Sequence, residues 1–256
     1  MKIGYYPRKS HRKLVAIIVA AAVLILLAAG LIIVATRPVF VSGSVDTSYM
    51  NRTQPVSFNW PTPGRGAIGT LDGGLEATSG DNKAYPTASL AKLITALVVL
   101  QKYPLDGGDG QTLTIGQTDV NFYNQTIADG GSNLPVKLGE TLSEKTALSG
   151  MLVASADNLA DSLASWAFGS LENYRATATT WLKQNGLTGT TIGRDASGLD
   201  PGTVSTTTDL FKLGQLTLKN ADLKNIVSQT TLAWQGKIVK NTNQLLGQDG
   251  YIGVKT

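Results

Sequence analysis

The chain is best understood from one short stretch, Ser89-Leu90-Ala91-Lys92, which places a hydroxyl and an amine one helical turn apart. The chain offers few other nucleophiles or bases, because it has no cysteine and a single histidine, His11, in a basic N-terminal tail. A Ser-His-Asp triad, a Cys-His dyad and a His-rich metal site are therefore excluded from the main domain. If the chain performs nucleophilic chemistry, a lysine or a carboxylate must activate the hydroxyl.

The surrounding sequence separates this stretch from a second copy of the same pattern at residues 10–13, which belongs to a charged tail. Residues 90–100 are apolar nearly all round, which is typical of a helix buried in the middle of a domain. A lysine in such a helix has a lowered pKa, and its neutral amine can take the proton of Ser89. The alternative is that Lys92 extends to solvent while Ser89 caps the helix.

A membrane anchor is predicted at the N-terminus. The first 37 residues hold six basic residues and no acidic one, and residues 14–35 form an unbroken apolar run. At about 1.5 Å per residue, this run can cross a hydrocarbon core of about 30 Å. We expect a cytoplasmic basic tail over residues 1–13, a single transmembrane helix over 14–36 in the cell membrane, and an extracytoplasmic remainder. A cleaved signal is the alternative.

Charged residues are distributed unevenly along the chain. It carries 22 basic and 18 acidic residues, and without the six N-terminal basic residues 16 basic and 18 acidic ones remain, a formal net charge of −2. The basic isoelectric point is therefore a property of the tail, and it does not argue for nucleic-acid binding. The absence of cysteine excludes disulfides and thiol chemistry.

Composition and periodicity predict a linker followed by one domain. Residues 37–63 contain several Pro, Ser, Asn and Thr without a helical period and are predicted to be the linker. Residues 64–256 are the domain, in which 105–140 is expected to be a long irregular excursion. Strands are expected at 66–70, 74–78 and 250–256, and helices at 89–103, 141–153, 159–168, 171–186 and 210–218.

Four motifs follow one another in this domain. They read Pro86-Thr-Ala-Ser-Leu-Ala-Lys-Leu-Ile-Thr95, Ser155-Ala-Asp157, Asp195-Ala-Ser-Gly-Leu-Asp-Pro201, and Asn243-Gln-Leu-Leu with Gly253-Val-Lys-Thr256. In this order they resemble the D-alanyl-D-alanine carboxypeptidase family, the low-molecular-weight penicillin-binding proteins. The resemblance implies an α/β fold of the β-lactamase/DD-peptidase type, with an antiparallel sheet flanked by helices.

The resemblance also implies an activity and residue roles. The activity is removal of the terminal D-alanine from peptidoglycan stem peptides, without a metal or an organic cofactor, and β-lactam antibiotics would act as inhibitors. Ser89 would form the acyl-enzyme, Lys92 would act as base, and Ser155 would pass a proton to the leaving amine. Substrate-binding roles would fall to Asp157, Asn158, Lys255 and Thr256.

Elementary chemistry supports part of this assignment. A small anionic peptide needs a cation at one end, which Lys255 can supply. The charge of Lys255 near Lys92 would also lower the pKa of Lys92. The structural alternatives are a solvated lysine at a sheet edge for Lys255 and a helix-ending role for Ser155.

The chain departs from the family pattern at Asp157, where the family has asparagine. An aspartate cannot donate a hydrogen bond to a substrate carbonyl, and near Lys92 it favours the ammonium form. Two alternatives remain: Asn158 substitutes if the turn shifts by one residue, or Asp157 simply caps the next helix. We predict that Asp157→Asn keeps or raises acylation by penicillin.

A second departure is that the chain stops at Thr256, whereas the family motif continues with glycine and further strands. We therefore expect a truncated reading frame without the last strands of the sheet, which would leave an edge unpaired. Two rival functions remain. A β-lactamase on the same fold is disfavoured because no Glu-x-x-Leu-Asn pattern is present, and a non-catalytic domain that binds wall peptides is favoured by Asp157.

Overall fold

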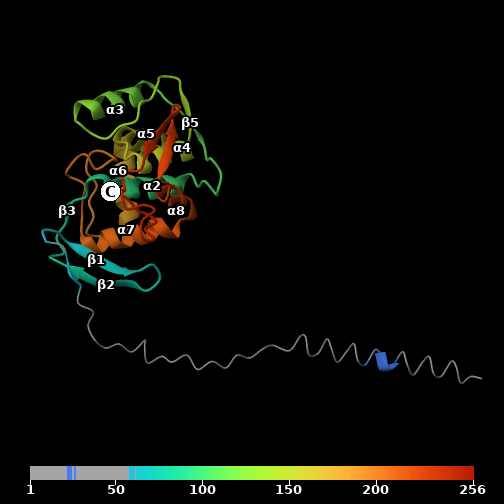
Figure 1. Cartoon of the computed structure of the whole chain (residues 1–256). Helices are drawn as coiled ribbons and strands as arrows, with labels where there is room; N and C mark the ends of the chain where they lie inside the picture. Colours follow the sequence, from blue (N-terminus) through green and yellow to red (C-terminus); the bar gives the residue numbers. More distant parts are fainter. Residues whose placement is uncertain (1–21, 25, 27–57, 61) are drawn as a thin grey trace, which may run out of the picture. The chain divides into compact units, whose positions relative to one another are not determined.

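The computed structural model describes residues 22–24, 26, 58–60 and 62–256 (Figure 1). The chain divides into two units, Met1–Ser57 and Phe58–Thr256. In the first unit residues 22–24 and 26 are helical, whereas the predicted tail over 1–13 and the rest of the predicted anchor over 14–36 lie outside the described residues. Most of the predicted linker lies outside them too. Within the described part of the chain, no helix is both long and apolar enough to cross a membrane.

The second unit is built around the helix that begins next to Ser89. This helix, α2 (Ala91–Lys102), lies among other helices in Figure 1, and its apolar side chains are buried except for Leu97, which is half-buried. Ile94, Ala96 and Val99 are fully inaccessible to solvent. Burying each larger side chain stabilises the fold by roughly 1.5–3 kcal/mol. Four helices pack against α2, namely α4 (Glu144–Val153), α5 (Asp157–Phe168), α6 (Leu171–Gln184) and α7 (Thr207–Lys219).

The segment 105–140 is more regular than predicted, because it contains the strand β4 (Thr112–Thr114) and the helix α3 (Gln117–Ala128). The Asp119 carboxylate accepts a hydrogen bond from the Gly116 N–H at 2.8 Å, which closes the first turn of α3. Polar residues dominate this helix, so its apolar period is weak in the sequence. Tertiary packing of α3 against α5 supplies the stability that its own propensity lacks.

Strands form antiparallel pairs, as predicted, but within the described residues they do not join into one sheet. The hairpin of β1 (Gly66–Thr70) and β2 (Gly74–Ser79) confirms the first two predicted strands, and it packs on α7. The other pairs are β3 (Tyr85–Pro86) with β6 (Val204–Ser205), β4 with β5 (Thr141–Ser143), and β7 (Thr231–Trp234) with β8 (Lys237–Lys240). The short helix α8 (Ala221–Val227) lies between α7 and β7.

The strand predicted at 250–256 is wrong, since these residues have no regular secondary structure. No strand of the described chain pairs with them, so the alternation of Ile252 and Val254 cannot produce a ladder. Val254 nevertheless packs on the edge of the core, while Ile252 is 48% exposed. The segment is therefore held by side-chain contacts rather than by sheet hydrogen bonds.

Candidate active site

Ser89 lies in a tight turn at the entrance to the buried helix. This turn, η2 (Ala88–Leu90), is a 3-10 helix that leads directly into α2. Ala88 has a φ of 45°, in the left-handed region that residues other than glycine rarely adopt. Such strain persists only where the surroundings enforce it, and it is common at active sites. The turn therefore presents Ser89 at the end of a helix that the core holds in place.

The loop over residues 195–201 enforces this turn. Gly198 has a φ of 81°, and a Cβ atom at this position would come within 2.0 Å of the Ala88 carbonyl oxygen, so only glycine fits. The Asp195 carboxylate holds the loop by accepting hydrogen bonds from the N–H groups of Ser197, Gly198 and Asp200 at 3.0, 2.7 and 2.5 Å.

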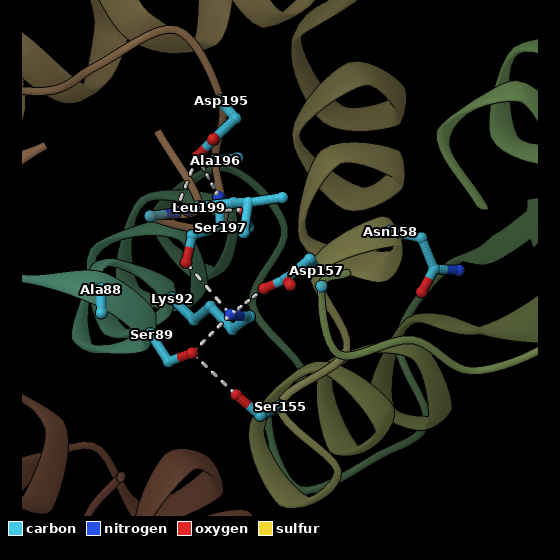
Figure 2. A network of polar contacts seen from close by, with 12 residues as sticks. Ala88, Ser89, Lys92, Ser155, Asp157, Asn158, Asp195, Ala196, Ser197 and Leu199 are labelled. Carbon is cyan, nitrogen blue, oxygen red and sulfur yellow. Dashed lines mark hydrogen bonds and ion pairs between the residues drawn. The ribbon is translucent and has the colours of Figure 1, made fainter. Parts of the chain in front are cut away.

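Lys92 lies one helical turn after Ser89, and its side chain is entirely buried. Figure 2 shows that its Nζ meets three oxygens: Ser89 Oγ at 3.0 Å, Asp157 Oδ1 at 2.5 Å and the Ser197 carbonyl oxygen at 3.0 Å. The alternative in which Lys92 extends to solvent is therefore wrong. Burial lowers the pKa of Lys92, and the Asp157 carboxylate opposes that shift.

Ser155 links Ser89 to a second lysine. It lies between α4 and α5 with a φ of 60°. The backbone turn that separates these two helices therefore also places the Ser155 hydroxyl at the site. Its hydroxyl donates a hydrogen bond to Ser89 Oγ at 2.9 Å, and Lys255 Nζ donates to Ser155 Oγ at 2.9 Å. A continuous line of polar groups therefore joins Lys92, Ser89, Ser155 and Lys255.

Lys255 belongs to this cluster and is not a solvated edge lysine. Burial, followed by the charge of Lys92, lowers the pKa of Lys255 to about 8. Its ammonium also contacts the backbone oxygen of Thr256. The hydroxyl of Thr256 lies farther out, where it donates a hydrogen bond to Thr242 Oγ1 at 2.9 Å.

Asp157 and Asn158 have different surroundings. The Asp157 carboxylate contacts Lys92 and makes no capping hydrogen bond, so the alternative of a helix cap is wrong. The Asn158 amide is fully buried on another side of α5, where it pairs with the backbone N–H and carbonyl of Leu134 at 3.1 and 3.0 Å (Figure 2). Asn158 thus cannot replace Asp157 at the site, and the substrate-binding role predicted for it is not supported by its position.

Two groups of the site were not predicted to have a function. One is the Ser197 carbonyl, which accepts from Lys92, and the other is Asp161, whose Oδ1 accepts the Ala196 N–H at 2.8 Å. The sequence does not indicate which backbone carbonyl points toward a lysine, although the motif at 195–201 that contains Ser197 was identified. Asp161 could have been found from its spacing, because it follows Asp157 by four residues on α5 and so faces the same way.

A cavity of about 580 Å³ lies beside this loop and is bordered by α3 and α5. Its lining includes Asp129, Asp161, Asp195 and Arg194, and Ser89 is not part of it. Burial raises the pKa of Asp161 to about 7, with smaller contributions from the neighbouring charges of Asp195 and Asp157 and an opposing hydrogen bond from Ala196.

A serine hydroxyl held between a buried lysine and a second serine, with another lysine behind it, is an arrangement suited to serine acyl transfer without histidine. The sequence pattern of the D-alanyl-D-alanine carboxypeptidase family (Peptidase_S11) matches residues 75–256, and the chain belongs to this family. Comparison with curated proteins finds no match.

Solved structures share the penicillin-binding, DD-peptidase fold. Penicillin-binding protein 6B of Escherichia coli is 22% identical with a TM-score of 0.63, over 73% of this chain and 58% of that one. The Streptomyces K15 DD-transpeptidase is 24% identical with a TM-score of 0.66, over 75% and 78% of the two chains. The D-alanyl-D-alanine carboxypeptidase of Mycobacterium tuberculosis H37Rv is 23% identical with a TM-score of 0.61, over 73% and 67%.

Proposed function

We propose that the chain is a serine-type D-alanyl-D-alanine carboxypeptidase that removes the terminal D-alanine of peptidoglycan stem peptides through an acyl-enzyme on Ser89. The observation that carries the proposal is that Ser89 Oγ lies within hydrogen-bond distance of both Lys92 Nζ and Ser155 Oγ. A serine needs a neighbouring base and a proton donor to attack a carbonyl and release an amine, and a lysine amine and a serine hydroxyl are groups of these two kinds.

The residues of the cluster divide the reaction between them. Ser89 Oγ attacks the carbonyl carbon between the two D-alanines while an amine of the cluster receives its proton; family resemblance assigns this role to Lys92. Ser155 then hands a proton to the leaving amine, and Lys255 attracts the terminal carboxylate of the substrate with Thr256 beside it. Water releases the acyl group from Ser89 and restores the hydroxyl.

β-Lactams are the second class of ligand in this proposal. Their strained amide would acylate Ser89 in the same way, which makes benzylpenicillin a direct probe of the nucleophile. A lasting adduct is expected of a carboxypeptidase, whereas rapid release of the hydrolysed drug would indicate a β-lactamase on the same fold.

The domain is proposed to work outside the cytoplasm, attached to the cell membrane by residues 14–36. The support comes from sequence alone: an apolar run that follows a basic tail, in a chain whose substrate would be the cell wall. Membrane fractionation, and digestion of intact cells and spheroplasts with an added protease, would test the location. Loss of the chain to the soluble fraction would count against the anchor.

One observation favours a second candidate, a non-catalytic domain that binds wall peptides. The ion pair between Asp157 and Lys92 opposes deprotonation of the lysine that the family uses as its base. This candidate predicts a folded protein that binds peptide and never forms a covalent adduct.

The decisive experiment is the intact mass of the full chain after incubation with benzylpenicillin. A one-to-one adduct that disappears in Ser89→Ala is the expected result. Ser10→Ala is the matched control, because Ser10 begins the other Ser-x-x-Lys pattern and its loss should leave the adduct intact. A well-folded chain without any adduct would contradict the carboxypeptidase proposal and support the binding domain.

A further inference from the structure

The partners of Lys92 determine how readily it can act as a base. The Asp157 carboxylate and the Ser197 carbonyl can only accept hydrogen bonds, so they occupy two of its N–H groups, and the third direction faces Ser89. An asparagine at position 157 would be a neutral partner. Asp157 instead places a negative charge 2.5 Å from Nζ, and the side chains of Lys92 and Asp157 are 0% and 7% exposed, so water screens the pair poorly.

Removing the proton from Lys92 would leave Asp157 as a buried anion without a counter-ion. An unpaired buried charge is far more costly than a buried ion pair, even though burial alone lowers the pKa of Lys92. The other carboxylates near Lys92 act in the same direction: Asp195 in the loop favours its ammonium form, and so does Asp161 on α5 once it loses its own proton near pH 7. A protonated Lys255 acts in the opposite direction. These three carboxylates therefore oppose the lowering of the Lys92 pKa by burial.

Lys255 is a second amine within reach of Ser89, through one hydroxyl. The two steps of the path measure 2.9 Å each, from Ser89 Oγ to Ser155 Oγ and from Ser155 Oγ to Lys255 Nζ. Among the described residues, Lys255 forms no ion pair with an acidic side chain. The charged side chains that act on it are Lys92, which disfavours its ammonium form, and more weakly Asp157, which favours it.

We propose that Asp157 keeps Lys92 as an ammonium throughout acylation, so that the proton of Ser89 leaves through Ser155 to Lys255. This inference rests on the proposed carboxypeptidase function and changes the route of the proton within it. It makes Lys255 the proton acceptor, in place of the cation that attracts the substrate carboxylate. Asp157 is then a positioning residue that acts through Lys92, and Lys92 stabilises the developing negative charge on Ser89 Oγ instead of receiving its proton.

The atoms balance along this route. Neutral Lys255 accepts the Ser155 proton while Ser155 accepts that of Ser89, and Ser89 Oγ bonds to the carbonyl carbon as the carbonyl electron pair moves to its oxygen. The pair then returns, the bond from carbon to the leaving nitrogen breaks, and the proton on Lys255 travels back through Ser155 to that nitrogen. Lys255 ends neutral, and Lys92 keeps its three protons.

The test is the rate of acylation by benzylpenicillin, followed by intact mass from about pH 6 to about pH 9 for the full chain. The wild-type rate should rise with pH until it levels off near pH 8, where Lys255 loses its proton. Lys255→Arg keeps a positive charge but cannot accept a proton, so the rate should fall by at least about 100-fold. The exposed Lys237→Arg is the matched control and should behave as wild type.

Two variants of Asp157 complete the test. In Asp157→Asn, Lys92 loses its counter-ion and can act as base, so the rate near pH 6 should exceed that of wild type by at least about tenfold. Asp157→Asn combined with Lys255→Arg should recover at least about tenfold over Lys255→Arg alone. Such a rescue would not follow from a merely structural role of Asp157.

Each contrary result has a defined meaning. An unchanged pH profile in Lys255→Arg would overturn the proton route. Slower acylation of Asp157→Asn than of wild type near pH 6, with an unchanged circular dichroism spectrum, would overturn the role of Asp157. This result does not depend on whether Lys255→Arg folds. Failure of wild type to form any adduct at any pH would instead overturn the proposed function, and this inference with it.

Discussion

At the scale of single residues, Asp161 couples the stability of the domain to pH. Burial raises its pKa in the folded protein from an ordinary 3.8 to about 7. Between these two values the folded chain binds more protons at this position than the unfolded chain does. The free energy of unfolding therefore falls as the pH rises from about 4 to about 7, and Asp161 adds no further slope above that range.

Asp161→Asn is expected to remove this slope. The side-chain oxygen of asparagine can still accept the Ala196 N–H, and the amide carries no charge to desolvate. At pH 8 the variant should be more stable than wild type by about 1–3 kcal/mol, and near pH 4 the two should be equal. Urea unfolding at both pH values measures the difference, with the exposed Asp72→Asn as control. A gain of the same size at both pH values would show that titration of Asp161 is not its source.

The residues of the site differ in how far sequence could predict them. Ser89 and Lys92 follow from their spacing within an apolar run, because that run forces the lysine into the core. Ser155 and Lys255 were recognised only by family motif, since their contact joins positions 100 residues apart. The role predicted for Asn158 is not supported by its position, because its amide pairs with the backbone of Leu134, which only the fold shows.

At the scale of elements, the site depends on two backbone segments that fix each other. The turn η2 presents Ser89, and the 195–201 loop presses its Gly198 against that turn while its Ser197 carbonyl receives Lys92. Thr95 ties the loop to α2, the helix that continues from η2, because its hydroxyl donates to the Ala196 carbonyl at 2.6 Å. A change in the loop should therefore act on Ser89 and Lys92 together.

Gly198→Ala tests this coupling. The new methyl group would overlap the Ala88 carbonyl oxygen, and alanine is strained at a φ of 81°. The variant should lose at least about 2 kcal/mol of stability and should acylate more slowly with benzylpenicillin. Gly214→Ala in α7 is the matched control: open space surrounds that position, so it should gain about 0.5–1 kcal/mol and keep the rate of wild type. Equal stability of the two variants in urea would contradict the close contact.

Elements were predictable where their apolar side chains repeat at a helical period and hard to predict elsewhere. α2 is the clearest success, since its burial on all sides was expected from an apolar run. α3 was missed because its polar sequence reads as a loop, and its packing against α5 is a contact between distant segments. The strand predicted at 250–256 is absent for a different reason. Alternation of apolar residues indicates which face a strand would bury, but it does not indicate whether a partner strand is present to pair with it.

At the scale of the whole molecule, the hydrophobic core belongs to one unit. Within the described part of the chain, every residue of the buried core cluster lies between Leu93 and Trp234, inside the unit Phe58–Thr256. The four residues of the polar line, Lys92, Ser89, Ser155 and Lys255, lie in the same unit. We therefore expect the domain to fold and to react without residues 1–57, whose proposed role is to locate the chain at the membrane.

A fragment of residues 58–256 is expected to fold with the same stability as the full chain and to form the same penicillin adduct. A loss of 1 kcal/mol in a unit of this size would lower the melting temperature by about 2–4 °C, so the two midpoints should agree within about 2 °C. Thermal unfolding by circular dichroism in one detergent buffer gives both values, and intact mass after benzylpenicillin gives the adduct. Because the described core and the residues of the candidate site lie within this unit, a fragment that melts without a cooperative transition would show that residues 1–57 stabilise the domain. A fragment that melts like the full chain but forms no adduct would show instead that they act on the site.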